Sequence, residues 1–435
     1  MFYFITEFMV IVLYLFNDIY GMLFSFCLFC YIFSKKNFSF FDKILTSSIM
    51  SLPLFNIGFA GKNMPHIFSW STIFIVLLII YLINNFIKSK ISVSKKSLFL
   101  VSIFITIPLV HCFFEVNFKN ALIEWCQLLL MVIPIYLVYI ERLELSNKIN
   151  FHEEYIDRIN SVLLATSFAV FFQYIMYNRF GIMVGEWTFY SGRTKIDLLF
   201  KGSSVLSMFI GMGIPLNVVK FLEKYDIKYL FFVIICFLGI IINSARTGLV
   251  AGLLASILPI IKSLKYKKSF FIIVLFTPIM VFSLVYGINY MLESRGSSNL
   301  IEENGRNETY KNGINLIVSS PRIVLFGNGL SLDNYNQVMP HNLFLESWLT
   351  MGLICLIIII FYLKRLLFEV KKYKYKYILW EIIISSMFIT NFTGNIFATV
   401  MFCIMLLLAS YVNISDNDEG MVLNEKKVFN NSSNI

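Results

Sequence analysis

Apolar runs of near-membrane length recur along the whole chain, such as STIFIVLLIIYLI at 71–83 and LTMGLICLIIIIFYL at 349–363. A run of about 20 apolar residues crosses a bilayer as a helix, because a helix satisfies its own backbone hydrogen bonds. The chain is 58% hydrophobic and 14% charged, which is too apolar for a soluble domain of 435 residues. We therefore predict an all-α fold, a polytopic integral membrane bundle of about 12–14 transmembrane helices with a long outward-facing loop.

Fourteen apolar spans can be read along this bundle, and the first and last pairs are short enough to form one re-entrant or tilted element each. The spans are 2–16, 19–34, 44–61, 67–87, 97–113, 120–140, 159–177, 203–222, 229–245, 247–263, 269–290, 342–363, 378–392 and 395–413. The helical bundle is thus expected over residues 1–413. The polar segment 414–435 is expected to be a disordered cytoplasmic tail.

Basic residues gather in alternate gaps between the spans. The gaps that hold most of the Lys and Arg residues should face the cytoplasm, together with both termini. The remaining gaps should face outward, and two of them are long, at 178–202 and 291–341. The net charge of +10 follows from this topology and does not indicate nucleic acid.

Arginine is enriched on the outward side. Lysine dominates the cytoplasmic gaps, whereas more than half of the outward basic residues are arginine. Topology needs only positive charge, but the planar guanidinium fork also matches phosphate oxygens and keeps its charge when partly buried. This bias favours a role beyond orientation, although small-number scatter and ordinary ion pairs with outward glutamates are the competing explanation.

Four polar motifs follow one another on the expected outward side. They are Ser191-Gly192-Arg193; Ser244-Ala245-Arg246-Thr247-Gly248; Gly305-Arg306 followed by Tyr310, Pro321 and Gly327-Asn328-Gly329; and His341-Asn342 followed by Gly352. Each motif is weak alone. Four motifs in order on one expected face, with apolar helices between them, form a more specific signal.

In these motifs the chain resembles the O-antigen polymerase and O-antigen ligase family of envelope glycan enzymes. The resemblance covers residues 190–363 and rests on an Arg-Thr pair that opens an apolar helix, a Gly-Arg…Pro…Gly-x-Gly loop and a His-Asn…Gly helix start. The chain departs from the family at KIDLLFKGSS, where an Asn-Pro or Glu-Pro pair is frequent. It also has Tyr310 where tryptophan is common.

The resemblance implies a substrate, which is a glycan carried on polyprenyl (undecaprenyl) diphosphate at the outer face of the cell inner membrane. Arginine side chains at the level of the lipid headgroups could bind the diphosphate of such a lipid, and an apolar groove between helices could hold its polyprenyl tail. The expected catalytic residues are His341, Arg306 and Arg246, and the expected substrate-binding residues are Arg193, Arg322, Tyr310 and Asn342.

His341 is the expected proton acceptor because it is the outward histidine beside an arginine-rich loop. His66 and His111 lie near span ends with no basic loop around them, and His152 is expected in the cytoplasm. An imidazole exchanges protons near neutral pH, and the positive end of a helix favours its neutral form. The arginines would stabilise the departing diphosphate. No cofactor or metal is expected, because the outward loops lack a DxD-type acidic cluster.

Structural roles compete with these assignments. His341 fits an ordinary residue at an interfacial helix start, and Arg246 fits a side chain that reaches for lipid headgroups. Arg306 fits a surface ion pair with Glu302. Arg322 fits an anchor at the membrane surface.

The leading functional hypothesis is a glycosyltransferase that polymerises lipid-linked repeat units of O-antigen or capsular polysaccharide. Its partners would be the polyprenyl diphosphate-linked oligosaccharide, the lipid bilayer and, in addition, a chain-length regulator. The nearest alternative is an O-antigen ligase that passes finished polymer to lipid A core or protein. A lipid-linked oligosaccharide flippase is the alternative from another class, and the scarcity of mid-span charges counts against it.

Overall fold

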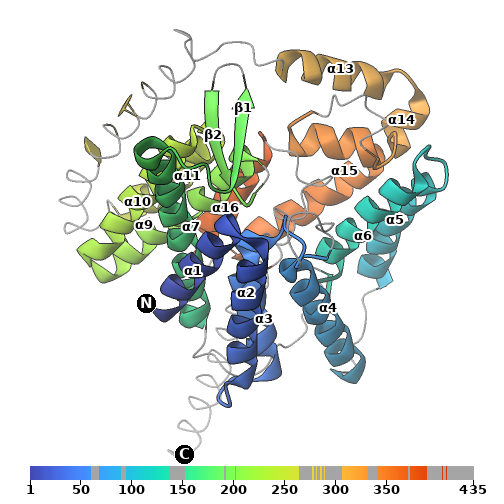
Figure 1. Cartoon of the computed structure of the whole chain (residues 1–435). Coiled ribbons are helices and arrows are strands. Elements are labelled where there is room, and N and C mark those ends of the chain that lie inside the picture. Colours follow the sequence, from blue (N-terminus) through green and yellow to red (C-terminus); the bar gives the residue numbers. More distant parts are fainter. Residues whose placement is uncertain are drawn as a thin grey trace, which may run out of the picture.

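The structure, a computed structural model, describes residues 1–59, 68–89, 95–134, 136–137, 152–190, 193–200, 202–263, 306–331, 340–370 and 373–388, with a few isolated positions beyond 263. Within these ranges the chain is almost wholly helical (Figure 1). The all-α fold predicted from the apolar runs is therefore confirmed.

The described helices share one bundle with a small antiparallel hairpin at one end (Figure 1). The helices are α1 (Phe2–Phe16), α2 (Asp18–Ser34), α3 (Phe40–Met50), α4 (Trp70–Ser89), α5 (Lys95–Cys112), α6 (Phe118–Pro134), α7 (His152–Phe180), α8 (Ser203–Gly211), α9 (Gly213–Lys224), α10 (Ile227–Asn243), α11 (Arg246–Ser263), α13 (Arg306–Val318), α14 (Pro321–Phe326), α15 (Leu343–Glu369) and α16 (Lys376–Ser386). The hairpin pairs β1 (Glu186–Tyr190) with β2 (Arg193–Leu198).

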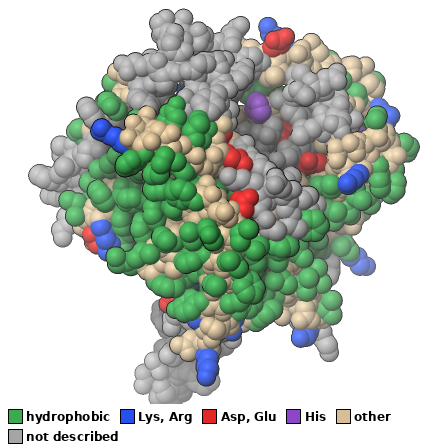
Figure 2. Space-filling model, in the orientation of Figure 1, with side chains coloured by type: hydrophobic (Ala, Val, Ile, Leu, Met, Phe, Trp, Pro, Cys, Tyr) green, Lys and Arg blue, Asp and Glu red, His purple; other side chains and the backbone are tan. Residues whose placement is uncertain are grey.

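Six helical segments among the described residues are long and apolar enough to cross a bilayer. They are Trp70–Lys88, Lys95–Cys112, His152–Phe180, Ser203–Lys224, Arg246–Ser263 and Leu343–Lys364. Helices α1, α2 and α10 are apolar but shorter. Hydrophobic side chains cover much of the face shown in Figure 2, as contact with lipid tails requires. The chain is a polytopic membrane protein.

The count of 12–14 spans stays a prediction. The expected spans 269–290 and 395–413 fall on described residues only at isolated positions. The expected tail at 414–435 lies outside the described residues.

The expected span at 44–61 is wrong. Helix α3 begins at Phe40, because Ser39 and Asp42 form a capping box in which each side chain bonds the backbone N–H of the other. The helix ends at Met50, and a short 3₁₀ turn over Leu52–Leu54 follows. Pro53 in that turn has no N–H to donate, so an α-helix that continued through it would lose a hydrogen bond.

Both long gaps that were expected to face outward contain secondary structure that the sequence did not suggest. The gap 178–202 holds the β1–β2 hairpin. The gap 291–341 holds α13 and α14, so its description as a loop is wrong for 306–326. Helix α13 forms because tertiary packing supports it: Ile317 packs against Leu349 of α15.

Helices α8 and α11 approach each other closely enough to exclude any side chain at Gly248. A Cβ atom built on Gly248 would lie 1.8 Å from the Ser207 carbonyl oxygen, and one on Gly211 would lie 2.8 Å from the Gly248 carbonyl oxygen. The Gly248 N–H donates to Ser207 Oγ at 3.2 Å. Small residues at such contacts are the usual means of packing helices in a membrane, so the start of α11 is held firmly.

Candidate active site

His341 and Asn342 form the start of α15. The Asn342 Oδ1 atom accepts hydrogen bonds from the backbone N–H groups of Phe344 at 3.1 Å and Leu345 at 3.2 Å. This is the geometry of a helix N-cap, so Asn342 has a structural role in addition to its predicted substrate contact. His341 is exposed and stands just before the cap, where a helix end presents positive potential.

Tyr310 and His341, predicted to share a site, do meet. The Tyr310 hydroxyl donates to the His341 carbonyl oxygen at 3.3 Å. The contact joins α13 to the start of α15, although the two residues lie 31 positions apart. Arg306 is the first residue of α13, one turn before Tyr310, so its backbone lies on the same side of the helix. The Arg306 side chain lies outside the described residues.

Arg322 is placed near a histidine that the sequence analysis had set aside. It is exposed in α14, and its positive charge acts on the imidazole of His111 at the end of α5. The expectation that no basic segment surrounds His111 is therefore wrong. The cause is the fold, which brings α14 to the α5–α6 turn across more than 200 residues of chain.

The Gly-x-Gly segment docks into a kink of α15. Gly352 is non-helical, with φ 83° and ψ 173°, so the regular helix is interrupted there. The Asn328 N–H donates to the Leu349 carbonyl at 2.8 Å, and the Gly329 N–H donates to the Thr350 carbonyl at 3.1 Å. The motif glycines thus fix the loop after α14 against the helix that carries His341.

A carboxylate from another part of the chain holds the same loop. The Glu115 side chain, in the α5–α6 turn, accepts hydrogen bonds from the backbone N–H groups of Leu330 at 2.6 Å and Ser331 at 3.0 Å. Hydrogen bonds to a charged acceptor are stronger than neutral ones. The sequence analysis missed Glu115, because nothing local connects it to a segment about 215 residues away.

Replacing Glu115 with alanine is expected to destabilise the protein by about 1–3 kcal/mol, because two backbone donors lose a charged partner. Thermal unfolding of the detergent-solubilised protein measures this loss. Glu115→Gln keeps one acceptor oxygen and should fall between alanine and the wild type. An alanine variant as stable as the wild type would show that the loop is held without Glu115.

Arg246 is the first residue of α11. Ser244, two residues earlier, is the left-handed residue that ends α10, with φ 61°. The turn therefore places Arg246 at the positive end of α11, with its guanidinium Nη2 atom buried. A partly buried guanidinium at a helix N-terminus favours an anionic partner, which suits a phosphate group.

A buried acid on α16 was not singled out from the sequence. Glu381 is fully buried and its Oε1 atom accepts from Ser385 Oγ at 2.8 Å. Its Oε2 atom has no hydrogen-bond partner among the described residues. Glu7 in α1 is equally buried, so mid-span acids are less scarce than expected. Glu381 could have been found from the sequence as an acidic residue within an apolar run, since such residues are candidates for functional positions.

Helix α16 lies against the helix pair α8–α11 near Arg246, and the residue just past its end contacts the start of α15. Glu381 lies against Gly211 beside Gly248, two residues into α11 from Arg246. The Met387 carbonyl, just past the end of α16, accepts from Asn342 Nδ2 at 3.5 Å. The starts of α11 and α15 are therefore connected through one short helix.

Arg193 lies at the tip of the hairpin, where its backbone pairs with Tyr190. The hairpin packs at its base against α7, α8 and α10. Trp187 of β1 packs on the Tyr177 ring, with centroids 4.8 Å apart, which is a structural role for this aromatic residue. The Arg193 side chain lies outside the described residues, so its contact with substrate stays a prediction.

A family model described as O-antigen ligase matches residues 231–360 of the chain. No curated protein matches the chain. The matched segment contains Arg246, Arg306, Tyr310, Arg322, His341, Asn342 and Gly352, but not Arg193. The resemblance read from the motifs is confirmed over this segment.

Proposed function

We propose that this chain, which matches the O-antigen ligase model over residues 231–360, polymerises lipid-linked oligosaccharides at the outer face of the cell inner membrane. It transfers a growing glycan from polyprenyl diphosphate to a sugar hydroxyl of the next lipid-linked repeat unit. The hydrogen bond from Tyr310 to the His341 carbonyl carries this proposal most directly. It joins α13, the helix that begins at Arg306, to the backbone of His341.

The transfer forms one bond and breaks another at the anomeric carbon of the donor sugar. The acceptor hydroxyl oxygen bonds to this carbon, and the bond to the diphosphate oxygen breaks. The hydroxyl proton passes to the neutral His341 imidazole. The electron pair leaves with the diphosphate, whose charge the guanidinium groups of Arg246 and Arg306 stabilise. The chemistry needs no nucleotide, because the lipid diphosphate is itself the leaving group.

The charge pattern supports the proposed orientation. Lys262 and Lys374 lie at or beyond the ends of α11 and α15, whereas Arg246 and His341 lie at the starts of these helices. By the positive-inside rule the lysine-rich end faces the cytoplasm, and the site faces outward. Both termini are assigned to the cytoplasm on the same ground.

A ligase is the second candidate, because the matched family model is described as O-antigen ligase. The two activities share the donor and the leaving group and differ in the acceptor. A ligase passes finished polymer to lipid A core or to protein. We favour the polymerase, because no sequence feature points to either of those acceptors.

Reconstitution with a synthetic polyprenyl diphosphate-linked repeat unit tests the function. The purified protein in vesicles should convert this single substrate into a ladder of longer lipid-linked glycans without added nucleotide or metal. The same ladder should form with a chelator present. Transfer only when lipid A core is supplied would identify a ligase. Movement of the intact lipid across the bilayer without any new glycosidic bond would identify a transporter.

A further inference from the structure

A basic pocket opens at the end of α11 that lies farthest from Arg246. It has a volume of about 580 Å³, which is within the range of ligand-binding pockets. Helices α9 and α11 and the segment before α16 supply its walls. The polar and aromatic lining includes Glu223, Lys262, Tyr373, Lys374, Lys376 and Tyr377.

Two lysines of the pocket converge on one aromatic ring. The Lys262 Nζ atom lies 5.9 Å and the Lys376 Nζ atom 5.8 Å from the centroid of Tyr377. Lys262 lies in the last turn of α11 and Lys376 begins α16, so the fold rather than the local sequence brings these ammonium groups together. Like charges held beside one ring create a positive potential that favours an anion between them.

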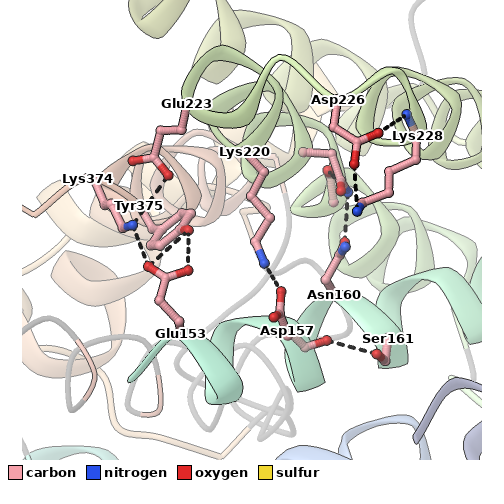
Figure 3. Close-up of polar contacts among 12 residues, drawn as sticks. Glu153, Asp157, Asn160, Ser161, Lys220, Glu223, Asp226, Lys228, Lys374 and Tyr375 are labelled. Atoms are coloured by element: carbon pink, nitrogen blue, oxygen red, sulfur yellow. Dashed lines mark hydrogen bonds and ion pairs between the residues drawn. The ribbon is translucent and has the colours of Figure 1, made fainter. Parts of the chain in front are cut away.

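The third lysine fixes the pocket wall. Figure 3 shows Lys374 between Glu153 of α7 and Glu223 of α9, with Nζ 3.3 Å from Glu223 Oε2 and an ion pair to Glu153. Tyr375 donates to Glu153 Oε2 at 3.0 Å in the same network. Burial opposes the charged form, but hydrogen bonding and charge from Glu153, and then from Glu223, raise the pKa of Lys374 above its ordinary value. Lys374 is thus charged and already paired.

The neighbouring surface of α11 suits hydrocarbon chains. Leu258 is 43% exposed and Ile261 is 54% exposed, and they lie beside Pro259 and Lys262 of the pocket. The 18 residues of α11 span about 27 Å, close to the thickness of a bilayer core. We therefore expect the pocket at one membrane surface, with the apolar face of α11 leading from it into the bilayer.

We propose that this pocket binds the phosphate headgroup of an anionic phospholipid, with its acyl chains along the exposed apolar face of α11. Lys262 and Lys376 contact the phosphate, and the Lys374 network holds the wall in place. Lysines at a cytoplasmic membrane surface attract anionic lipids, and basic pockets between helices concentrate this effect. The site is separate from the proposed glycan site, because the two lie at opposite ends of α11.

Thermal unfolding in defined vesicles tests the site. The full-length protein should unfold at a higher temperature in phosphatidylcholine vesicles with a fraction of phosphatidylglycerol than in phosphatidylcholine alone. The double variant Lys262→Gln/Lys376→Gln should lose most of this rise, since the two charges account for a roughly tenfold or larger part of the affinity. Lys36→Gln/Lys88→Gln is the matched control, because both lysines are exposed on the same expected face away from the pocket. The control should keep the rise.

Three outcomes of the same thermal-unfolding experiment would overturn the proposal. An equal rise in the pocket variant and in the control would mean that phosphatidylglycerol acts elsewhere. A full rise with glycerol 3-phosphate or inorganic phosphate in detergent would show that the pocket takes a free anion, not a lipid. A larger rise with polyprenyl phosphate than with phosphatidylglycerol would assign the pocket to the carrier lipid. Lys262→Arg/Lys376→Arg keeps both charges and should respond as the wild type does.

Discussion

Replacing His341 with alanine is expected to lower the rate of glycan elongation by about two to four orders of magnitude, the usual loss when a general base is removed. The fold should survive, because the His341 side chain is exposed and the Tyr310 hydroxyl bonds its backbone carbonyl, which alanine keeps. The rate is measured on the synthetic lipid-linked repeat unit, with thermal unfolding as a check on folding. The loss should therefore appear in the rate and not in stability.

Variants of two neighbouring residues test whether the loss of rate is specific to the His341 imidazole. Lys311→Ala removes an exposed cation next to Tyr310 and should leave the rate unchanged. Tyr310→Phe removes one hydroxyl and one hydrogen bond, worth about 0.5–1.5 kcal/mol, so the rate should fall by no more than about tenfold. If His341→Ala elongates glycans at the wild-type rate, the proton acceptor is another group and the proposed chemistry fails.

That the chain is a membrane protein could be predicted from the sequence, because the bilayer restricts the composition of every segment that crosses it. Any segment that crosses hydrocarbon must be apolar and must bond its own backbone, so spans such as 67–87 and 247–263 are visible as composition alone. The same restriction makes polar motifs easy to recognise between the apolar spans. His341 and Tyr310 could be grouped from the sequence for that reason, and the structure brings them into contact.

The positions of the connecting segments could not be predicted, because they depend on long-range contacts. Helix α13 is polar, and its packing against α14 and α15, centred on Ile317 and Leu349, explains why it is a helix. The contact between Glu115 and the loop at Leu330 joins distant segments through backbone N–H groups, which carry no side-chain signature. The burial of Glu381 likewise depends on the close approach of α8, α11 and α16.

Replacing Gly352 with alanine is expected to cost more than about 3 kcal/mol of stability, through two separate effects. Its φ of 83° and ψ of 173° belong to a region that only glycine adopts readily, and strain there costs about 1–3 kcal/mol. A Cβ atom would also lie 2.3 Å from the Leu325 carbonyl oxygen and 2.4 Å from the Phe326 carbonyl carbon. Both are backbone atoms, so α14 would have to move away from α15.

Gly313→Ala is the matched control, since a Cβ atom there meets nothing closer than a Pro340 side-chain atom at 3.4 Å. It should fold with normal yield and unfold near the wild-type temperature, whereas Gly352→Ala should give little folded protein. A Gly352→Ala protein of normal stability would mean that α15 does not carry this kink. Because Gly352 acts through the docking of α14, any loss of elongation in its variants should follow the loss of folded protein. The loss in His341→Ala should occur in fully folded protein, and this difference separates the residue that performs the transfer from the residue that holds its helix in place.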